Sequence, residues 1–317
     1  MKPRPFRFGV QCIHLPTPDW AAYVRRIEAL GYSTVFCPDH FSPQWDPTVL
    51  LTAAASVTTR LRVGSLVYGV DYRHPVIYAK QAATLHLLSG GRHEFGLGAG
   101  WMETDYEQAG IACDSPGTRI ARLEEALQIA LGMWSQDTFS FPGKHYTIRA
   151  VPKAAALPPG ERPTLLIGGG GKRLLSVAGR YADIVGINPS LPEGKILPTT
   201  PADLTPSRVR EKIGWVRAAA EKAGRDPASL EYQSLSFVLA LTDDPSPLRR
   251  ALAGNTGMSE QEVADCPLFL TGTAAEIQDR LLARREATGL SYIVIQGKDL
   301  AQVERFAEEV MRPLAAA

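Results

Sequence analysis

The chain has 317 residues, of which 45% are hydrophobic, and its 34 Lys and Arg nearly balance its 33 Asp and Glu. This composition is that of a globular protein with a sizeable core, and the lack of a basic run argues against nucleic-acid binding and electrostatic membrane docking. No apolar run reaches the roughly 20 residues that span a bilayer, and no signal-peptide pattern follows Met1, so we expect a cytoplasmic protein.

Short β-rich runs alternate with longer helical segments from one end of the chain to the other. Strands are predicted at 6–12, 33–37, 61–67, 93–97, 164–167, 183–187, 231–241 and 292–295. Helices are predicted at 19–30, 46–57, 74–88, 118–134, 172–181, 207–223, 274–288 and 300–311. Eight strands that each precede a helix predict an α/β fold, a (β/α)8 TIM barrel with loop insertions, rather than a doubly wound open sheet.

Two proline-rich stretches interrupt this alternation, at 139–163 and 189–206. We interpret both as loops inserted into a single barrel domain that spans residues 1–317, rather than as linkers between domains. Because barrel enzymes vary their substrate specificity through the loops that follow their strands, the second stretch is the better candidate for a substrate cover. A plain surface insertion is an equally good interpretation of it.

Four consecutive glycines, Gly168 to Gly171, follow an apolar predicted strand and open a helix that starts with Lys172 and Arg173. Glycines allow backbone N–H groups to turn toward one point, and a helix N-terminus favours an anion there. The run matches neither a Walker A loop nor the Rossmann pattern. It predicts a phosphate site at the rim of the barrel, with a flexible strand-to-helix turn as the alternative.

Two further segments stand at the ends of predicted strands. Glycines alternate along 96–100 and end beside Trp101, an arrangement that lets a flat ligand lie against the backbone, with a core tryptophan as the alternative. Asp39 and His40 follow the strand at 33–37, where a histidine suits proton transfer near neutral pH, although a structural histidine fits equally well. The other histidines are isolated and the four cysteines form no C-x-x-C pair, which disfavours a metal site.

Four stretches of the sequence carry a family resemblance. They are LGYSTVFCPDHF (30–41), the run 61–101 with RHP, LSGGR and GLGAGW, IGGGGKRLLSVAGRYADIVGIN (167–188), and FLTGTAAEIQDRLLARREATGLSYIVIQG (269–297). In this order they resemble the luciferase-like monooxygenase superfamily, and within it most closely the coenzyme F420-dependent oxidoreductases. The resemblance implies an enzyme that forms a homodimer, acts on a small-molecule substrate and binds F420, or alternatively FMN, across the C-terminal ends of its barrel strands.

The resemblance also implies positions for individual residues around the cofactor. Asp39 and His40 would lie near the ring, with His40 as the catalytic residue. Ser65, Leu66 and Val67 would back the ring, with a non-prolyl cis peptide bond expected at Leu66–Val67. Residues expected to flank the ring are Ala99, Gly100 and Trp101, and those expected to hold the phosphate are Gly168, Gly169, Gly170, Gly171 and Lys172.

The leading hypothesis is that F420 passes a hydride to a C=C, C=N or C=O bond of an unidentified organic substrate while His40 handles a proton. Trp101 stands where some F420-dependent sugar-phosphate dehydrogenases carry a proton-donating glutamate, which argues against that substrate class. Other candidates for the proton relay are Tyr68, Asp71 and Tyr106. An FMN-dependent monooxygenase is the main alternative, followed by a cofactor-free barrel hydrolase and by a non-catalytic relative that binds flavin or F420.

Overall fold

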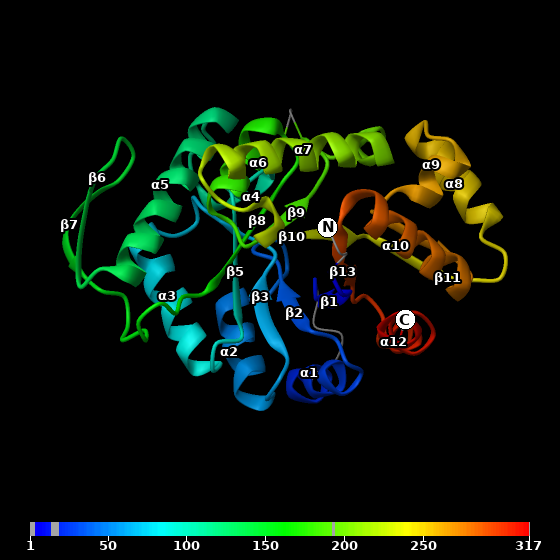
Figure 1. Ribbon diagram of the computed structural model, residues 1–317, viewed down its shortest axis with the longest axis horizontal. Coiled ribbons are helices and arrows are strands. Elements are labelled where there is room, and N and C mark those ends of the chain that lie inside the picture. Colours follow the sequence, from blue (N-terminus) through cyan, green and yellow to red (C-terminus); the bar gives the residue numbers. More distant parts are fainter. Residues whose placement is uncertain (1–3, 14–18, 192–193, 317) are drawn as a thin grey trace.

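The computed structural model describes residues 4–13, 19–191 and 194–316, and within them a closed parallel barrel forms the centre of the molecule (Figure 1). Its strands, in order around the barrel, are β1 (Arg7–Gln11), β2 (Thr34–Cys37), β3 (Arg62–Ser65), β5 (His93–Gly98), β8 (Thr164–Gly169), β9 (Ile184–Ile187), β10 (Glu231–Ser236) and β13 (Leu290–Gln296). Because β13 pairs with β1 and β3 pairs with β5, the sheet closes on itself. The predicted TIM barrel is therefore confirmed.

Helices cover the outside of this barrel (Figure 1). The main ones are α1 (Trp20–Ala29), α2 (Pro47–Val57), α3 (Pro75–Leu88), α5 (Pro116–Ser135), α6 (Lys172–Tyr181), α7 (Pro206–Lys222), α10 (Ala274–Thr288) and α11 (Leu300–Phe306). Local signals fix several of their ends. Asp46 caps α2 by accepting a hydrogen bond from the Val49 N–H (3.1 Å), and Gly31 takes a φ of 91° just after α1. Thr273 and Glu276 form a capping box at the start of α10.

The first proline-rich stretch contains regular structure that the sequence did not lead us to expect. An antiparallel hairpin of β6 (Thr138–Pro142) and β7 (Thr147–Pro152) occupies its first half and lies at the edge of the molecule (Figure 1). Phe139 and Ile148, one from each strand, are buried in the hydrophobic core with residues of α5. These two apolar anchors hold the hairpin against the barrel, although prolines obscure the strand pattern in the sequence.

The predicted strand at 231–241 is wrong in its second half. It divides after Ser236, and the elements that follow are β11 (Val238–Leu241), α8 (Ser246–Thr256), α9 (Glu260–Asp265) and β12 (Phe269–Gly272). The N–H groups of Phe237 and Val238 both donate to the Leu268 carbonyl (2.9 and 3.1 Å). The chain therefore turns out of the barrel, and β11 pairs in parallel with β12 in a separate two-stranded sheet.

Three smaller differences concern the ends of elements. The strand predicted at 61–67 ends at Ser65, and the short β4 (Tyr68–Gly69) continues beside β5. Smaller elements outside the prediction are α4 (Glu103–Ala109), η1 (Thr200–Leu204) and α12 (Arg312–Ala316), whereas the last predicted helix, 300–311, divides into α11 and a π-helical turn (Ala307–Met311). Residues 192 and 193 of the second proline-rich stretch lie outside the described residues. Within the described ranges, the helices are too short or too polar to cross a membrane.

Large and small residues complement one another inside the barrel. Phe36 occupies the space beside Gly9 and Gly64, where a Cβ at Gly64 would lie 2.6 Å from Phe36 Cε1. The buried residues that form one cluster with Phe36 are Leu66, Leu166, Ile184, Leu235, Tyr292 and Val294. This apolar packing fills the middle of the barrel, as a TIM barrel requires, so that its two ends are chemically independent.

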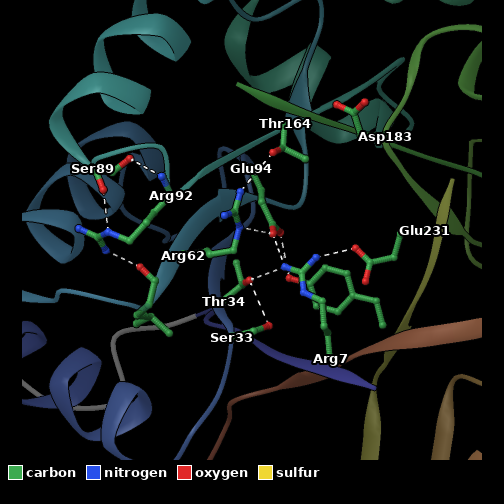
Figure 2. Close-up of polar contacts among 12 residues, drawn as sticks. Arg7, Ser33, Thr34, Arg62, Ser89, Arg92, Glu94, Thr164, Asp183 and Glu231 are labelled. Atoms are coloured by element: carbon green, nitrogen blue, oxygen red, sulfur yellow. Dashed lines mark hydrogen bonds and ion pairs between the residues drawn. The ribbon is translucent and has the colours of Figure 1, made fainter. Parts of the chain in front are cut away.

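Charged side chains fill the floor of the barrel, at the N-terminal ends of its strands (Figure 2). Glu94 is fully buried and accepts hydrogen bonds from Arg62 Nε (2.7 Å) and from the Tyr292 hydroxyl (2.9 Å). Arg7 pairs with the same carboxylate and, at 2.5 Å, with Glu231. Because enzymes of this fold carry out catalysis at the opposite end of the barrel, we assign this network to stability.

Candidate functional site

Val67 reaches across the mouth of the barrel, at the C-terminal ends of the strands. A Cβ at Gly98 would lie 2.6 Å from Val67 Cγ2, and one at Gly96 would lie 3.1 Å from Val67 Cγ1. A Cβ at Gly168 would lie 3.8 Å from that same methyl group, so Val67 brings the ends of β5 and β8 together. The peptide bond between Leu66 and Val67 is cis, which confirms the expectation.

Two polar side chains hold the backbone on either side of this cis peptide bond. Ser65 Oγ donates a hydrogen bond to the Gly96 carbonyl (2.7 Å) and accepts one from the Gly96 N–H (3.1 Å). Gln11 Nε2 donates to the Leu66 carbonyl (2.8 Å). Because Ser65 and Gln11 are both buried, they hold the backbone that carries Val67, whereas the Leu66 side chain packs in the middle of the barrel.

His40 forms the most definite polar contact of the mouth. Its Nδ1 lies 2.6 Å from Oδ2 of Asp105, a residue of α4. The buried Asp105 carboxylate also accepts hydrogen bonds from the Phe41 N–H (3.2 Å) and from the Tyr72 hydroxyl (3.1 Å). Three donors from the loops after β2 and β4 therefore converge on one carboxylate, which orients the imidazole.

This contact bears on which nitrogen of the imidazole carries a proton. An ionised Asp105 accepts only, so Nδ1 of His40 carries the proton that they share, and Nε2 is left to exchange a proton with a ligand. Among the described residues, Nε2 makes no hydrogen bond. The His40 side chain is 22% exposed to solvent. The Trp101 ring stands edge-on to the imidazole, with ring centroids 5.8 Å apart and planes at 83°.

Asp39, the neighbour of His40, contacts a different set of residues. Its carboxylate accepts hydrogen bonds from Arg73 (2.8 Å) and from the Gly69 N–H (3.3 Å). Burial raises the pKa of this carboxyl group, and the Arg73 guanidinium opposes that effect. Asp39 thus anchors β4 and the Arg73 side chain, which also pairs with Asp46 at 2.8 Å.

The other candidates for a proton relay are paired with one another or lie elsewhere. Tyr106 donates a hydrogen bond to Asp71 (2.9 Å), and burial raises the pKa of both groups. The Tyr106 hydroxyl also packs on Gly100, where a Cβ would lie 1.9 Å from its oxygen and φ is 72°, so that only glycine fits. Tyr68 is buried in the outer core and shares a hydrogen bond with Thr48 (3.1 Å), away from the mouth.

Ala99, which was expected to flank the ring, is buried, and its carbonyl accepts a hydrogen bond from Arg119 (3.1 Å).

The four glycines after β8 are not equivalent. Gly168 and Gly169 are the last two residues of the strand, and Gly171 is the N-cap of α6. A Cβ at Gly170 would lie 2.2 Å from both the carbonyl carbon and the carbonyl oxygen of Pro189, so a side chain there would force the backbone apart. A Cβ at Gly171 would meet nothing nearer than the Ser190 hydroxyl, at 3.6 Å. Gly170 is therefore the position where the backbone of β8 touches the chain after β9.

The start of α6 suits an anion. Gly171 provides no side-chain cap, and within the described residues its N–H makes no hydrogen bond. Lys172 and Arg173 follow in the first turn, both exposed and both outside the ion pairs of the described residues. Free N–H groups at a positive helix end, next to two cations, are what a phosphate group requires. The predicted phosphate loop thus has the geometry that its proposed role needs.

Two residues at the mouth were missed by the sequence reasoning. Asp105 is separated from His40 by 65 positions, and nothing in the sequence links them. Lys212 reaches the Gly170 carbonyl from α7 with its Nζ at 2.6 Å. The sequence does contain a sign that Lys212 is buried. It lies on the same helical face as Val209 and Val216, where a buried side chain is expected.

The fold and the mouth together define a class of protein, a TIM barrel with a glycine-rich turn after its fifth barrel strand and a histidine beside its opening. The profile of the luciferase-like monooxygenase family matches residues 15–289. The chain belongs to this family, and the proteins that it resembles include oxidoreductases and monooxygenases. The resemblance noted in the sequence is therefore confirmed.

Individual relatives narrow the comparison. A phthiodiolone/phenolphthiodiolone dimycocerosates ketoreductase of Mycobacterium bovis (strain BCG / Pasteur 1173P2) is 34% identical over 208 residues, 64% of this chain and 49% of the relative. The chain thus spans about half the length of the curated relatives that it matches first. An F420-dependent secondary alcohol dehydrogenase in complex with an F420-acetone adduct has a similar fold, with a TM-score of 0.78, 18% identity and coverage of 98% of this chain and 99% of the other.

A second solved structure has a different cofactor. The oxygenating constituent of 3,6-diketocamphane monooxygenase from the CAM plasmid of Pseudomonas putida, in complex with FMN, aligns with a TM-score of 0.72 and 16% identity, over 99% of this chain and 98% of the other. At this identity both solved structures are evidence for the fold alone. The relatives are consistent with a deazaflavin or a flavin cofactor and do not distinguish between the two.

Proposed function

We propose that this protein is an F420-dependent oxidoreductase that transfers a hydride between the deazaflavin and the carbonyl carbon of an organic substrate. The observation that carries the proposal is the His40–Asp105 pair at the barrel mouth, with Nδ1 and Oδ2 2.6 Å apart and Nε2 free of other described partners. Conversion of a ketone to an alcohol adds a hydride to carbon and a proton to oxygen, so the site needs a proton carrier. His40 is the residue best placed for that role.

The residues of the mouth fit a cofactor with a flat ring and a phosphate. Val67 forms an apolar wall, and Gly96 and Gly98 of β5 leave the space that its two methyl groups occupy. The uncapped start of α6, from Gly171 onward, would hold the phosphate. When bound, the deazaflavin supplies the hydride or accepts it, whereas the protein contributes binding, orientation and the proton.

Asp105 determines how His40 handles that proton. In the direction of reduction, a protonated His40 donates the Nε2 proton to the carbonyl oxygen and becomes neutral. In the direction of oxidation, neutral His40 accepts the hydroxyl proton at Nε2 and becomes an imidazolium. The Asp105 carboxylate stabilises this cation and keeps the proton on Nδ1 in both states, so that Nε2 is always the reacting nitrogen.

A carbonyl or alcohol substrate is favoured over the C=C and C=N alternatives by the mycobacterial relative, which is named as a ketoreductase. Exposed apolar side chains on the loops after β2, β9 and β10 favour a substrate with a hydrocarbon body; they are Phe41, Trp45, Ile196, Leu197 and Phe237. We therefore propose a ketone or secondary alcohol with apolar substituents.

The experiment begins with the purified protein and measures F420 and FMN binding by absorbance and fluorescence titration. His40→Gln is expected to lower kcat for ketone reduction about 10²–10⁴-fold, the usual contribution of general acid–base catalysis, with the F420 Kd unchanged within about twofold. His145→Gln, in the turn of the β6–β7 hairpin, is the matched control and should behave as wild type. Wild-type kcat in His40→Gln would contradict the proposed role.

The binding titration also separates the two cofactors. Tight FMN binding without F420 affinity, together with oxygen consumption by the reduced protein, would replace the proposal by an FMN-dependent monooxygenase. Failure to bind either cofactor would favour a cofactor-free hydrolase. F420 binding in a protein that turns over no ketone, alcohol or other acceptor would indicate a non-catalytic relative.

We also propose that two copies of the chain associate through α2 and α3. These helices border an apolar groove of about 300 Å³, lined among others by Val76, Ile77, Leu85 and Leu88, and Val49 projects from the α2 surface next to it. Large exposed apolar side chains beside a groove of this kind are typical of protein interfaces. Leu88→Asp is expected to convert a dimer into a monomer in light scattering after size-exclusion chromatography, and a wild-type monomer would refute the proposal.

A further inference from the structure

A fully buried lysine lies directly beneath the glycine loop. Lys212, on α7, donates one hydrogen bond to the Gly170 carbonyl (2.6 Å) and another to Oδ2 of Asp203 (2.7 Å). Burial lowers the pKa of the ammonium group, and the Asp203 carboxylate opposes that effect. The function proposed above makes no use of this lysine.

Asp203 connects the lysine to the chain that follows β9. Its carboxylate accepts hydrogen bonds from the Ser190 N–H (2.7 Å) and from Arg208 Nε (2.9 Å). Although burial alone would raise the pKa of Asp203, the hydrogen bonds from Lys212, Ser190 and Arg208 outweigh it, so the pKa is lowered. The carboxylate therefore stays ionised, and one ion pair ties the glycine loop to η1 and to the start of the second proline-rich stretch.

Stability alone does not account for a lysine at this place. Its helical face is apolar, with Val209, Ile213 and Val216 buried around it. A well-packed apolar side chain in place of a buried ion pair is often neutral or stabilising, since taking charges out of water is costly. The pair must therefore be explained by what it does to the groups that it contacts.

The contacted group is the peptide that joins Gly170 to Gly171. Its carbonyl oxygen accepts from Lys212, and its N–H is the one that makes no hydrogen bond within the described residues. In a trans peptide the C=O and N–H point in opposite directions, so a cation on the oxygen side turns the N–H away from α7. The positive charge of Lys212 beside the carbonyl oxygen also polarises the peptide and makes its N–H a stronger donor.

We infer that Lys212 is a positioning residue, which aims and polarises the Gly171 N–H toward the cofactor phosphate and links phosphate binding to the ordering of residues 194–206 through Asp203. This inference rests on the proposed cofactor site. The link runs from phosphate to the Gly170–Gly171 peptide, to the Lys212 ammonium, to the Asp203 carboxylate in η1. Because such a coupling is reciprocal, the cofactor stabilises this segment as much as the segment stabilises the cofactor.

The test uses the full chain and two readouts, the cofactor Kd and the rate of tryptic cleavage after Lys195. This lysine is exposed, lies in the segment 194–206, and among the described residues forms one ion pair, with Glu103 at 3.9 Å. Bound F420 should slow cleavage at Lys195 in the wild-type protein. Lys212→Met should weaken F420 binding about tenfold or more, as expected when a charged hydrogen-bond donor is lost, and should remove this protection.

A matched control and a second variant separate positioning from stability. Lys222→Met changes an exposed lysine of the same helix and should retain wild-type Kd and protection. Asp203→Asn keeps the lysine beneath the loop, so F420 affinity should fall less than in Lys212→Met, whereas protection at Lys195 should be lost. This variant tests the coupling even where Lys212→Met fails to fold. A merely structural role would accelerate cleavage at all sites without changing the protection that F420 gives.

The outcomes distinguish this inference from the proposed function. Wild-type Kd and protection in a folded Lys212→Met protein, or full protection in Asp203→Asn, would overturn the inference and leave the F420 proposal intact. Binding of FMN in place of F420 changes the cofactor but leaves the prediction the same, since both carry a phosphate. Failure of the wild-type protein to bind either cofactor would overturn the proposed function, and the inference with it.

Discussion

Replacement of Gly170 by alanine tests the phosphate loop more sharply than any other single substitution. The added Cβ would lie 2.2 Å from the carbonyl carbon and oxygen of Pro189 and 2.3 Å from the Ser190 nitrogen. Ordinary contacts of a methyl group with these atoms need more than 3.4 Å, so the loop or its neighbour must move by about 1 Å. All three atoms belong to the backbone, and no rotation of a side chain relieves the clash.

The cost follows from the usual penalty for overpacking. An extra methyl group in a well-packed region costs about 1–3 kcal/mol. If the loop relaxes by moving away from Pro189, the phosphate-binding N–H groups lose their alignment, and cofactor binding must restore it at that same cost. We therefore expect the F420 Kd of Gly170→Ala to rise about 5- to 150-fold. The free energy of unfolding without cofactor should fall by at most the same 1–3 kcal/mol.

Gly171→Ala is the control for the steric clash alone, because its N–H is itself a proposed phosphate donor. Its Cβ would meet only the Ser190 hydroxyl at 3.6 Å, and the residue has an ordinary φ of −83°. Alanine at such a position often stabilises a protein by about 0.4–1 kcal/mol, because it restricts the unfolded chain. The two variants are compared by F420 fluorescence titration and urea unfolding. Equal affinities in Gly170→Ala, Gly171→Ala and wild type would refute the role of this loop.

Two predictions concern the rest of the barrel. Burial lowers the pKa of His93 to about 4, so the unfolded chain binds a proton near its ordinary value of 6.5 before the folded one does, and stability falls as pH drops through that window. We expect the free energy of unfolding to fall by about 2–3 kcal/mol between pH 7.5 and 4.5. Urea unfolding at the two pH values should show a smaller fall for His93→Gln. An unchanged pH dependence in this variant would contradict the assignment of the effect to His93. Glu94→Leu should lower the free energy of unfolding by about 3–5 kcal/mol, because Arg7 and Arg62 lose their buried partner, and a loss below about 1 kcal/mol would show that the floor network contributes little.

Local sequence patterns predicted most of the barrel because the signals that end its elements are local. Asp46 with the following proline, and Thr273 with Glu276, fixed the starts of α2 and α10 through hydrogen bonds within four residues. The prediction failed at Phe237, because it joined the apolar run that begins there to the strand that ends at Ser236. The turn there depends on the Leu268 carbonyl, which is far away in the sequence. The periodic pattern of apolar residues contains no information about a hydrogen-bond partner so far away in the sequence.

The sequence by itself determined the closed barrel, the glycine run that marks its rim, and the cis peptide position expected from the family resemblance. Only the tertiary structure decided which glycine has no room for a side chain, since Gly170 differs from Gly171 by its approach to Pro189 rather than by any neighbour in sequence. It alone paired His40 with Asp105, across 65 positions, and placed Lys212 beneath the loop. The physical reason is that barrel closure brings the ends of separate strands to one mouth, where contacts depend on three-dimensional proximity that no local pattern encodes.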